Sequence, residues 1–235
     1  MNAPTTLELR FASEDTLTAA LSERIVGQLR AALAAGREAS LVVPGGRTPV
    51  PLFRRLRTSA LDWRRVWITL ADERWVDAQA EASNEALARR ELLKDAAAQA
   101  HFVGLKNHAA TAAAGAARSA AALAAVPRPF DAVLLGMGED GHFASLFPHS
   151  PGLRAALDPD AEPGCVPMQA PSPPQERITL NLSALLDARL LLLPLPGAAK
   201  ASTLRAAQAP GPETELPVRA LLRQHRVPLE IYRNP

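Results

Sequence analysis

The chain contains one stretch, residues 130–148, in which a short apolar run leads directly into a glycine-rich turn; it reads FDAVLLGMGEDGHFASLFP. The apolar part, residues 130–135, is typical of a buried strand. The glycines that follow let the backbone turn tightly or come close to a ligand. Asp140 and His142 stand in this turn. An acid and an imidazole therefore follow a buried strand, and we expect the chemistry of the protein here.

Two other interpretations of this turn come from the residues alone. Its glycines match the GxGxxG pattern of dinucleotide sites, which need a helix that opens at the third glycine and amides that face a pyrophosphate. Glu139 and Asp140 would bring negative charge to that anion, and Pro148 and Pro151 interrupt a long helix. NAD binding is therefore disfavoured. A solvated turn with an incidental histidine stays open at this point.

Short apolar segments alternate with helical patterns along the chain. Leucine and isoleucine recur every four residues from Leu17 to Leu33, which predicts a helix with Ser13 as its N-cap and Gly36 at its end. This alternation predicts one α/β domain over residues 1–235, an open, mostly parallel sheet with helices on both faces. We expect strands at 7–11, 40–43, 66–70, 101–103, 130–135, 177–180, 188–193 and 229–232, and further helices at 51–57, 83–94, 109–126, near 200 and at 217–223.

Composition narrows the possible partners. Net charge is +2, aromatic residues make up 4%, and no run of Lys or Arg occurs, which argues against nucleic-acid binding. The single cysteine, Cys165, cannot form an internal disulfide and suits a reducing cytosol; we expect it to be a small buried apolar residue. The first eleven residues do not resemble a signal peptide, and Arg118 interrupts the alanine-rich segment. We therefore expect a cytoplasmic protein with no membrane partner.

A second glycine turn follows the predicted strand at 40–43. Gly45, Gly46, Arg47 and Thr48 combine free backbone amides, a cation and a hydroxyl at the start of a helix, which favours anion binding. The segment is not a Walker loop, because no Gly-Lys-Ser/Thr follows. A plain surface turn is an equally good interpretation of this segment alone.

Charged residues also stand near other predicted strands. Asp72 and Arg74 follow the strand at 66–70, and ligands of open α/β sheets collect beyond the carboxyl ends of strands. Arg177 begins a strand, and Lys200 follows another. The alternative for Asp72 and Arg74 is a solvated loop with an internal Glu73–Arg74 pair. Ordinary surface charge is the alternative for Arg177 and Lys200.

Taken together, four motifs resemble the glucosamine-6-phosphate deaminase/6-phosphogluconolactonase family, and within it the lactonases. They are PGGRTP at 44–49, ADERWV at 71–76, GMGEDGHFASLFP at 136–148 and RITL at 177–180, with a weaker match, GAAK, at 197–200. The resemblance implies a fold similar to glucosamine-6-phosphate deaminase and ribose-5-phosphate isomerase. It also implies hydrolysis of 6-phosphoglucono-1,5-lactone in the pentose phosphate pathway, with no cofactor. We further expect a monomer whose partner is this small molecule. We expect no metal requirement, because the five histidines show no HxxxH pair on a convincing helix and one cysteine cannot build a thiolate site.

The resemblance also implies roles for single residues. His142 is then the general base and later the general acid, because one imidazole can perform both transfers in turn. Asp140 sets its tautomer or contacts substrate hydroxyls, and Asp72 is a further candidate acid. Backbone amides of the turn at 136–141 are candidates for oxyanion binding. The expected substrate-binding residues are Gly45, Gly46, Arg47, Thr48, Arg74, Gly138, Arg177 and Lys200.

Two alternatives to the lactonase remain. The similar deaminases carry a Glu five residues after the histidine and a Tyr at the position of Arg74, whereas this chain has Phe147 and Arg74. An isomerase or deaminase on this scaffold would therefore lack a carboxylate. A non-catalytic sugar-phosphate sensor could keep the anion cradle but would not need His142.

Overall fold

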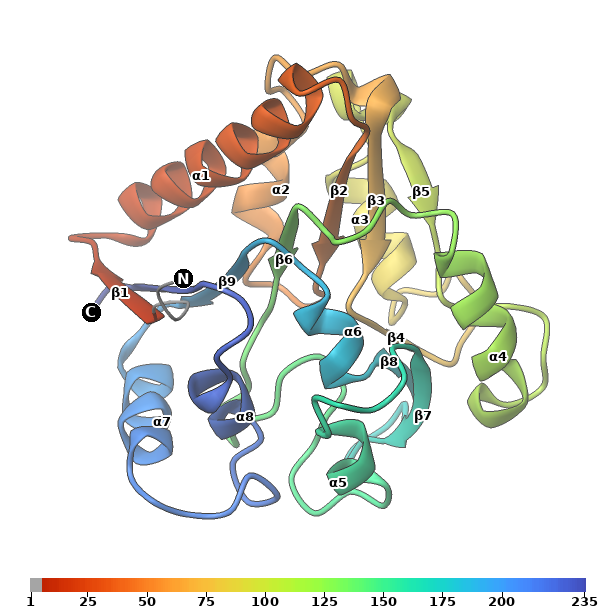
Figure 1. The fold of residues 1–235 in the computed structure, drawn as a ribbon, viewed down its shortest axis with the longest axis vertical. Coiled ribbons are helices and arrows are strands. Elements are labelled where there is room, and N and C mark those ends of the chain that lie inside the picture. The colour runs from red at the N-terminus through yellow and green to blue at the C-terminus, as the bar shows by residue number, and fades with distance from the viewer. Residues whose placement is uncertain (1–5) are drawn as a thin grey trace.

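A computed structural model describes residues 6–235 of the chain, and residues 1–5, which begin the segment for which no signal peptide is expected, lie outside that range. A seven-stranded sheet in the order β1-β10-β9-β6-β2-β3-β5 forms the centre of the fold (Figure 1). All its neighbouring strands pair in parallel. Its strands are β1 Thr6–Arg10, β2 Ala39–Val43, β3 Val66–Leu70, β5 His101–Val103, β6 Ala132–Leu134, β9 Leu191–Leu195 and β10 Leu229–Arg233.

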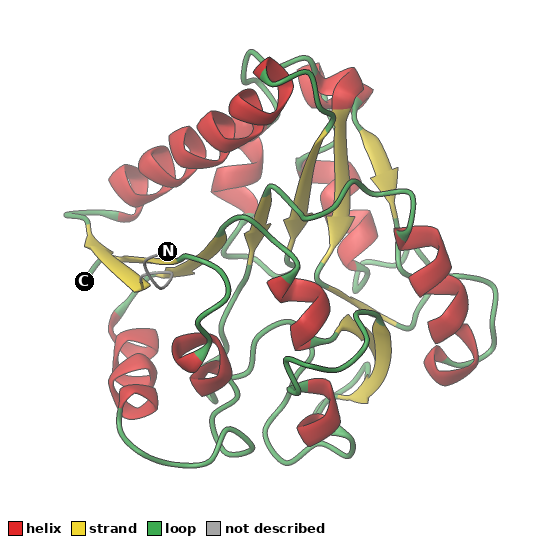
Figure 2. Cartoon of the chain, in the orientation of Figure 1, coloured by secondary structure: helices red, strands yellow, loops and turns green. Residues whose placement is uncertain are grey.

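Helices surround this sheet (Figure 2). Helix α1 packs on α2 and on strands β2, β6 and β10, and α7 packs on α8. The predicted class, an open parallel α/β sheet, is therefore confirmed. The α-helices are α1 Glu14–Ala34, α2 Val50–Leu56, α3 Asn84–Glu91, α4 Ala112–Leu123, α5 Leu153–Ala156, α6 Leu182–Leu186, α7 Ala198–Gln208 and α8 Val218–Arg223, and two 3₁₀ turns cover Trp63–Arg65 and Asp95–Gln99.

The first helix illustrates how closely local sequence specifies local structure. The Ser13 hydroxyl accepts a hydrogen bond from the backbone N–H of Thr16, and the Thr16 hydroxyl satisfies the backbone of Ser13 in return, which completes a capping box. Leu21 and Leu29 of the predicted stripe are buried. Gly36 follows the helix with φ 78°, a left-handed conformation that suits glycine.

A second, antiparallel sheet was not predicted. It has the order β4-β8-β7, with β4 Asp72–Arg74, β7 Cys165–Gln169 and β8 Glu176–Leu180. The alternative interpretation of Asp72 and Arg74 as a solvated loop is therefore wrong. Strand β4 consists only of charged residues and carries no apolar signal, so it forms because β8 offers a pairing edge. Helix α4 packs on β7 and β8 and covers the small sheet.

Several predicted boundaries also shift. Strand β9 begins three residues later than expected and includes Pro194, which a sheet tolerates here because the pairing of β9 with β6 has already ended at Leu192. Helix α3 ends at Glu91 instead of Lys94. Leu7, expected on a half-buried face, is 47% exposed on the edge strand β1. The short apolar helix α6, Leu182–Leu186, was not predicted, because five residues are too few to show a helical repeat.

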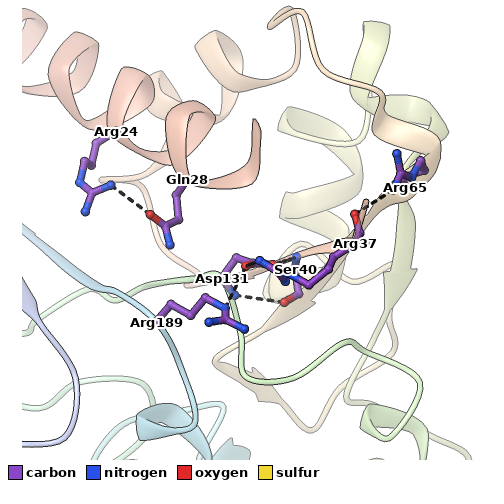
Figure 3. A network of polar contacts seen from close by, with 7 residues as sticks. All are labelled: Arg24, Gln28, Arg37, Ser40, Arg65, Asp131 and Arg189. Atoms are coloured by element: carbon purple, nitrogen blue, oxygen red, sulfur yellow. Dashed lines mark hydrogen bonds and ion pairs between the residues drawn. The ribbon is translucent and has the colours of Figure 1, made fainter. Parts of the chain in front are cut away.

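A buried carboxylate joins the starts of two central strands (Figure 3). Asp131, 1% exposed, accepts hydrogen bonds from the backbone N–H of Ser40 at 3.0 Å and from Arg37 at 3.1 Å. Arg189 also pairs with it, at 3.4 Å. The hydroxyl of Ser40 accepts the N–H of Asp131 at 3.2 Å, so the two residues bond reciprocally. This network ties β2 to β6 at their N-terminal ends.

The opposite edge of the sheet gathers the predicted motifs. Strands β2, β3, β6 and β9 run parallel, so the segments that follow them emerge at the same edge. These segments are residues 44–49, 71–76, 136–148 and 196–200. The fold therefore brings together four of the five motifs by strand direction alone. Over residues 6–235, the structure shows no helix that is both long and apolar enough to cross a lipid bilayer.

Candidate active site

A pocket of about 310 Å³ opens at this edge. Its walls come from the loops after β2, β3, β6 and β9, and from Ser172 and Arg177 at the small sheet. Most of the residues expected to bind or transform substrate line it: Gly45, Gly46, Thr48, Asp72, Arg74, Gly138, His142, Arg177 and Lys200.

His142 is held by the carboxylate of Asp140. Nδ1 of His142 lies 2.6 Å from Oδ1 of Asp140, and the same oxygen accepts the backbone N–H of His142 at 3.2 Å. Burial raises the pKa of Asp140, but the hydrogen bond and the charge of His142 together lower it below its ordinary value. An ionised Asp140 accepts a proton-bearing Nδ1, which leaves Nε2 as the proton acceptor of the ring.

The glycine turn closes on itself through two hydrogen bonds. The N–H of Gly138 donates to the carbonyl of His142 at 2.9 Å, and the N–H of Gly141 donates to the carbonyl of Gly138 at 3.0 Å. Both amides already donate to protein carbonyls. The expected oxyanion site within residues 136–141 is therefore limited to the other backbone amides of this turn. Gly138 must be glycine here, because a Cβ at this position would lie 2.3 Å from the His142 ring. Gly141 has φ 78°.

Phe147 forms an apolar wall beside the imidazole. Its ring centroid lies 4.5 Å from that of His142 at an interplanar angle of 41°. The guanidinium of Arg177 lies 5.8 Å from the centroid of the same ring. Phe147 is buried and has no hydrogen-bonding atom in its side chain. An apolar ring therefore contacts His142 at the position where the similar deaminases carry a carboxylate.

Asp72 lines the pocket but is tied to buried neighbours. Its Oδ2 accepts the hydroxyl of Ser145 at 2.5 Å, and its Oδ1 lies 3.4 Å from Nδ2 of Asn84. Nδ2 of Asn84 also donates to the backbone carbonyl of Asp72 at 2.8 Å. Asp72 therefore joins the segment that follows His142 to the start of helix α3. Both carboxylate oxygens of Asp72 have protein partners. This arrangement fits a residue that holds the pocket wall in place at least as well as it fits a proton donor.

The Glu73–Arg74 side-chain pair of the alternative interpretation does not form. Glu73 is fully buried, and its carboxylate accepts the hydroxyl of Ser83 and the backbone N–H groups of Arg74, Asn84 and Glu85 at 2.6–2.9 Å. Burial raises the pKa of Glu73, while the amides of Asn84 and Glu85 offset part of that rise. Glu73 therefore caps the start of α3 from a neighbouring strand and fixes Asn84 in the pocket wall.

Cations form another wall of the pocket. Arg74 and Arg177 are direct partners across the antiparallel pair β4–β8. Arg74 donates to the carbonyl of Ala82, and Nε of Arg177 donates to that of Pro174 at 2.9 Å. Burial, and then the charge of Arg74, lower the pKa of Arg177. Two neighbouring guanidinium groups, one of them buried, make this wall attractive to an anion.

Lys200 approaches the glycine loop after β2 from helix α7. Its Nζ lies 3.4 Å from the hydroxyl of Thr48. Burial lowers the pKa of Lys200, and the charges of Glu139 and Glu14 offset part of that effect. Within residues 6–235, the backbone amides of Gly46, Arg47 and Thr48 donate to no protein acceptor. The predicted anion cradle thus contains free amides, a hydroxyl and a half-buried ammonium group.

Two predicted residues lie off the pocket wall. Arg47 is exposed and lines a neighbouring hollow with Glu14 and Asn234, so the structure does not place it with the other cations of the site. Asp140 contacts His142 from behind. The sequence analysis also missed Asn84, Ala144 and Ser172 as lining residues. Ala144 has φ 49°, a strained backbone conformation that the sequence does not predict for alanine.

The single cysteine of the chain, Cys165, lies outside the pocket. Burial raises the pKa of the Cys165 thiol to about 12, and the charge of Arg128 offsets only part of the rise. Cys165 is therefore an inert buried residue, as expected. Among residues 6–235, no three His, Cys, Asp or Glu side chains gather closely enough to hold one metal ion.

Comparisons with known proteins agree with this geometry. Residues 12–229 match the family described as glucosamine-6-phosphate isomerases/6-phosphogluconolactonase. The 6-phosphogluconolactonase of Pseudomonas putida is 45% identical over 225 residues, which are 96% of this chain and 91% of that protein. The crystal structure of a 6-phosphogluconolactonase from Shewanella baltica OS155 superposes with a TM-score of 0.93 at 44% identity and covers 98% of both chains.

A more distant neighbour confirms the expected fold relationship. A monomeric glucosamine-6-phosphate deaminase superposes with a TM-score of 0.77 over 97% of both chains, at 16% identity. At that identity the likeness concerns the fold alone.

Proposed function

The chain belongs to the glucosamine-6-phosphate isomerase/6-phosphogluconolactonase family, and we propose that it hydrolyses 6-phospho-glucono-1,5-lactone to 6-phosphogluconate in the pentose phosphate pathway. The observation that carries the proposal is His142, which is held by Asp140 and lines a pocket walled by Arg74, Arg177 and Lys200. This arrangement offers a base for water and cations for a phosphate in one cavity.

His142 performs two proton transfers in the proposed mechanism. Its Nε2 takes a proton from a water molecule while the oxygen of that water attacks the lactone carbonyl carbon. The imidazolium, stabilised by Asp140, then returns the proton to the ring oxygen as the carbon–oxygen bond breaks. The products are an open-chain acid and a regenerated neutral imidazole. Nucleophile and proton come from water, so the step needs no oxidant, reductant or cofactor.

Lys200 is assigned to the phosphate end of the substrate, whereas Arg74 and Arg177 suit either end. Free amides of the loop at 46–48 together with Lys200 suit the phosphate, because ammonium and amide donors both complement its charge. Arg74 and Arg177 stand on the small sheet, beside Phe147 and near the imidazole wall. They suit either the phosphate or the oxyanion that forms at the lactone carbonyl.

Phe147 favours a lactonase over a deaminase or isomerase. Those reactions open a sugar ring and move a proton between carbons, for which the similar deaminases have a carboxylate at this position. A phenyl ring 4.5 Å from the imidazole can neither accept a hydrogen bond nor carry charge.

Two assays on the purified protein test this assignment. Lactone hydrolysis is followed by coupled detection of 6-phosphogluconate, after subtraction of spontaneous opening, and ammonia release from glucosamine 6-phosphate is measured in parallel. We expect fast hydrolysis and no ammonia above the blank. Robust ammonia release, with lactone opening no faster than in buffer, would reverse the assignment in favour of the deaminase.

Assembly and location are further parts of the proposal. Among residues 6–235, Leu7 is the large hydrophobic side chain that remains exposed, which leaves no extended apolar patch for a stable partner and supports a monomer. The single cysteine and its buried thiol suit a reducing compartment, which supports a cytoplasmic location.

A further inference from the structure

Thr203 connects the helix that carries Lys200 to the turn that carries His142. Its hydroxyl donates a hydrogen bond to the backbone carbonyl of Glu139 at 2.7 Å. Lys200 lies one helical turn earlier on α7, and His142 follows Glu139 by three residues. Thr203 does not line the pocket, so its hydroxyl acts on the turn and not on a bound substrate.

Hydrogen bonds join the residues of the turn at 138–142 into one closed unit. Hydrogen bonds from Gly138 to His142 and from Gly141 to Gly138 enclose Glu139 within it. Asp140, the next residue, holds both the backbone and the ring of His142. The position of the Glu139 carbonyl therefore influences the position of the imidazole, because both belong to the same closed hydrogen-bonded loop.

The other end of the connection is also rigid. Helix α7 spans Ala198–Gln208, and Ala201 and Leu204 anchor it in the apolar interior. Lys200 projects from its first turn to within 3.4 Å of the Thr48 hydroxyl. A phosphate held between the loop at 46–48 and Lys200 would fix the start of this helix. Thr203 would then fix the turn in the same position.

We propose that Thr203 is a positioning residue that couples phosphate binding at Lys200 to the placement of His142. The inference rests on the proposed function, in which Lys200 binds the phosphate. Such coupling uses the binding energy of a remote, non-reacting group to orient the catalytic base. It predicts that the phosphate promotes the chemical step in addition to holding the substrate.

A set of matched variants tests the coupling. Thr203→Val removes the hydroxyl and keeps the β-branched shape, Thr203→Ser keeps the hydroxyl, and Ser202→Ala removes an exposed hydroxyl from the next position as a control. For the phosphorylated lactone, we expect Thr203→Val to lower kcat about 3- to 10-fold, as for one lost hydrogen bond, with KM within about twofold. Thr203→Ser and Ser202→Ala should match the wild type.

The unphosphorylated lactone separates coupling from simple support of the turn. Glucono-1,5-lactone does not engage Lys200, so we expect Thr203→Val and wild type to hydrolyse it at equal rates. An equal loss on both lactones would assign Thr203 a merely structural role and overturn the proposal. Unchanged kcat for Thr203→Val on the phosphorylated lactone would overturn it as well. Thermal unfolding of each variant checks that the fold is intact.

A measurement without turnover keeps this inference separate from the lactonase assignment. Titration of inorganic phosphate is followed by the amide NMR signals of residues 136–142. We expect these signals to shift in the wild type and in Thr203→Ser, and to respond at least threefold less in Thr203→Val. Equal shifts in all the variants, or none in the wild type, would contradict the coupling. Failure of wild-type lactone hydrolysis alone would contradict only the proposed function.

Discussion

Oδ1 of Asp140 accepts hydrogen bonds from both the ring and the backbone of His142, at 2.6 Å from Nδ1 and 3.2 Å from the amide nitrogen. One carboxylate oxygen thus fixes the position of the residue and the tautomer of its imidazole. In the proposed mechanism the ring becomes positively charged when it takes a proton from water, so the charge of Asp140 would stabilise that step and not the bound substrate.

Asp140→Asn tests this relationship. An amide can still accept a hydrogen bond but brings no charge to the imidazolium, so we expect kcat to fall about 10- to 150-fold, the range for a hydrogen bond to a charged group. KM should change by less than about threefold, because the substrate has not yet reacted. Steady-state kinetics on the phosphorylated lactone measure both. A rise in KM at constant kcat would show that Asp140 binds substrate hydroxyls instead.

The depressed pKa of Asp140 predicts a specific pH dependence of stability. A carboxyl group whose pKa is lower in the folded than in the unfolded state stabilises the fold above the unfolded value of about 3.8, and this contribution is lost as pH falls through the folded value. The difference in melting temperature between wild type and Asp140→Asn should therefore shrink as pH falls below about pH 4. A difference that grows below about pH 4 would contradict the assignment.

Lys200→Gln tests the phosphate site. The direct contact with the phosphate is similar in the ground and transition states, so we expect KM to rise about 10- to 150-fold, whereas loss of the coupling through Thr203 should lower kcat by only about 3- to 10-fold. The wild type should also prefer the phosphorylated lactone over glucono-1,5-lactone by at least the same factor in kcat/KM. Equal kcat/KM values for the two lactones would refute a phosphate site at Lys200.

The network around Asp131 predicts a stability effect far from the pocket (Figure 3). Asp131→Ala leaves the buried N–H of Ser40 without its acceptor and separates Arg37 from its partner, so we expect a loss of about 1–3 kcal/mol in the free energy of unfolding. Asp131→Asn keeps an acceptor for Ser40 and should lose less. Urea unfolding measures both, and kcat below the transition should stay unchanged. Equal stability of wild type and Asp131→Ala would remove this network from the account.

Much of the parallel sheet was predictable because its central strands are short, mostly apolar and separated by helical patterns. Strands β2 and β3 and the start of α1 follow directly from such signals. The small antiparallel sheet was not predictable, since β4 has only charged residues and becomes a strand through its pairing with β8. Tertiary pairing overrides local propensity in that segment.

The sequence predicted the reactive and charged residues of the site better than the buried contacts that hold them in place. The resemblance in motifs directed attention to His142, and strand direction explains why its loop meets Lys200. The burial of Glu73 and the contacts of Asn84 with Asp72 depend on segments that meet only in the folded chain, so no local pattern indicates them. The side chain of Arg47 lines a neighbouring hollow, since a glycine turn does not specify which of its side chains faces the pocket.

The most direct test of the account compares wild type with His142→Ala in the hydrolysis of the phosphorylated lactone at saturating substrate. Spontaneous opening is subtracted, and binding of 6-phosphogluconate is measured as a control for an intact pocket. A positioned base contributes about 10²- to 10⁴-fold, so we expect kcat to fall by that amount while product binding survives. A variant that retains kcat within twofold of wild type would contradict the central role of His142.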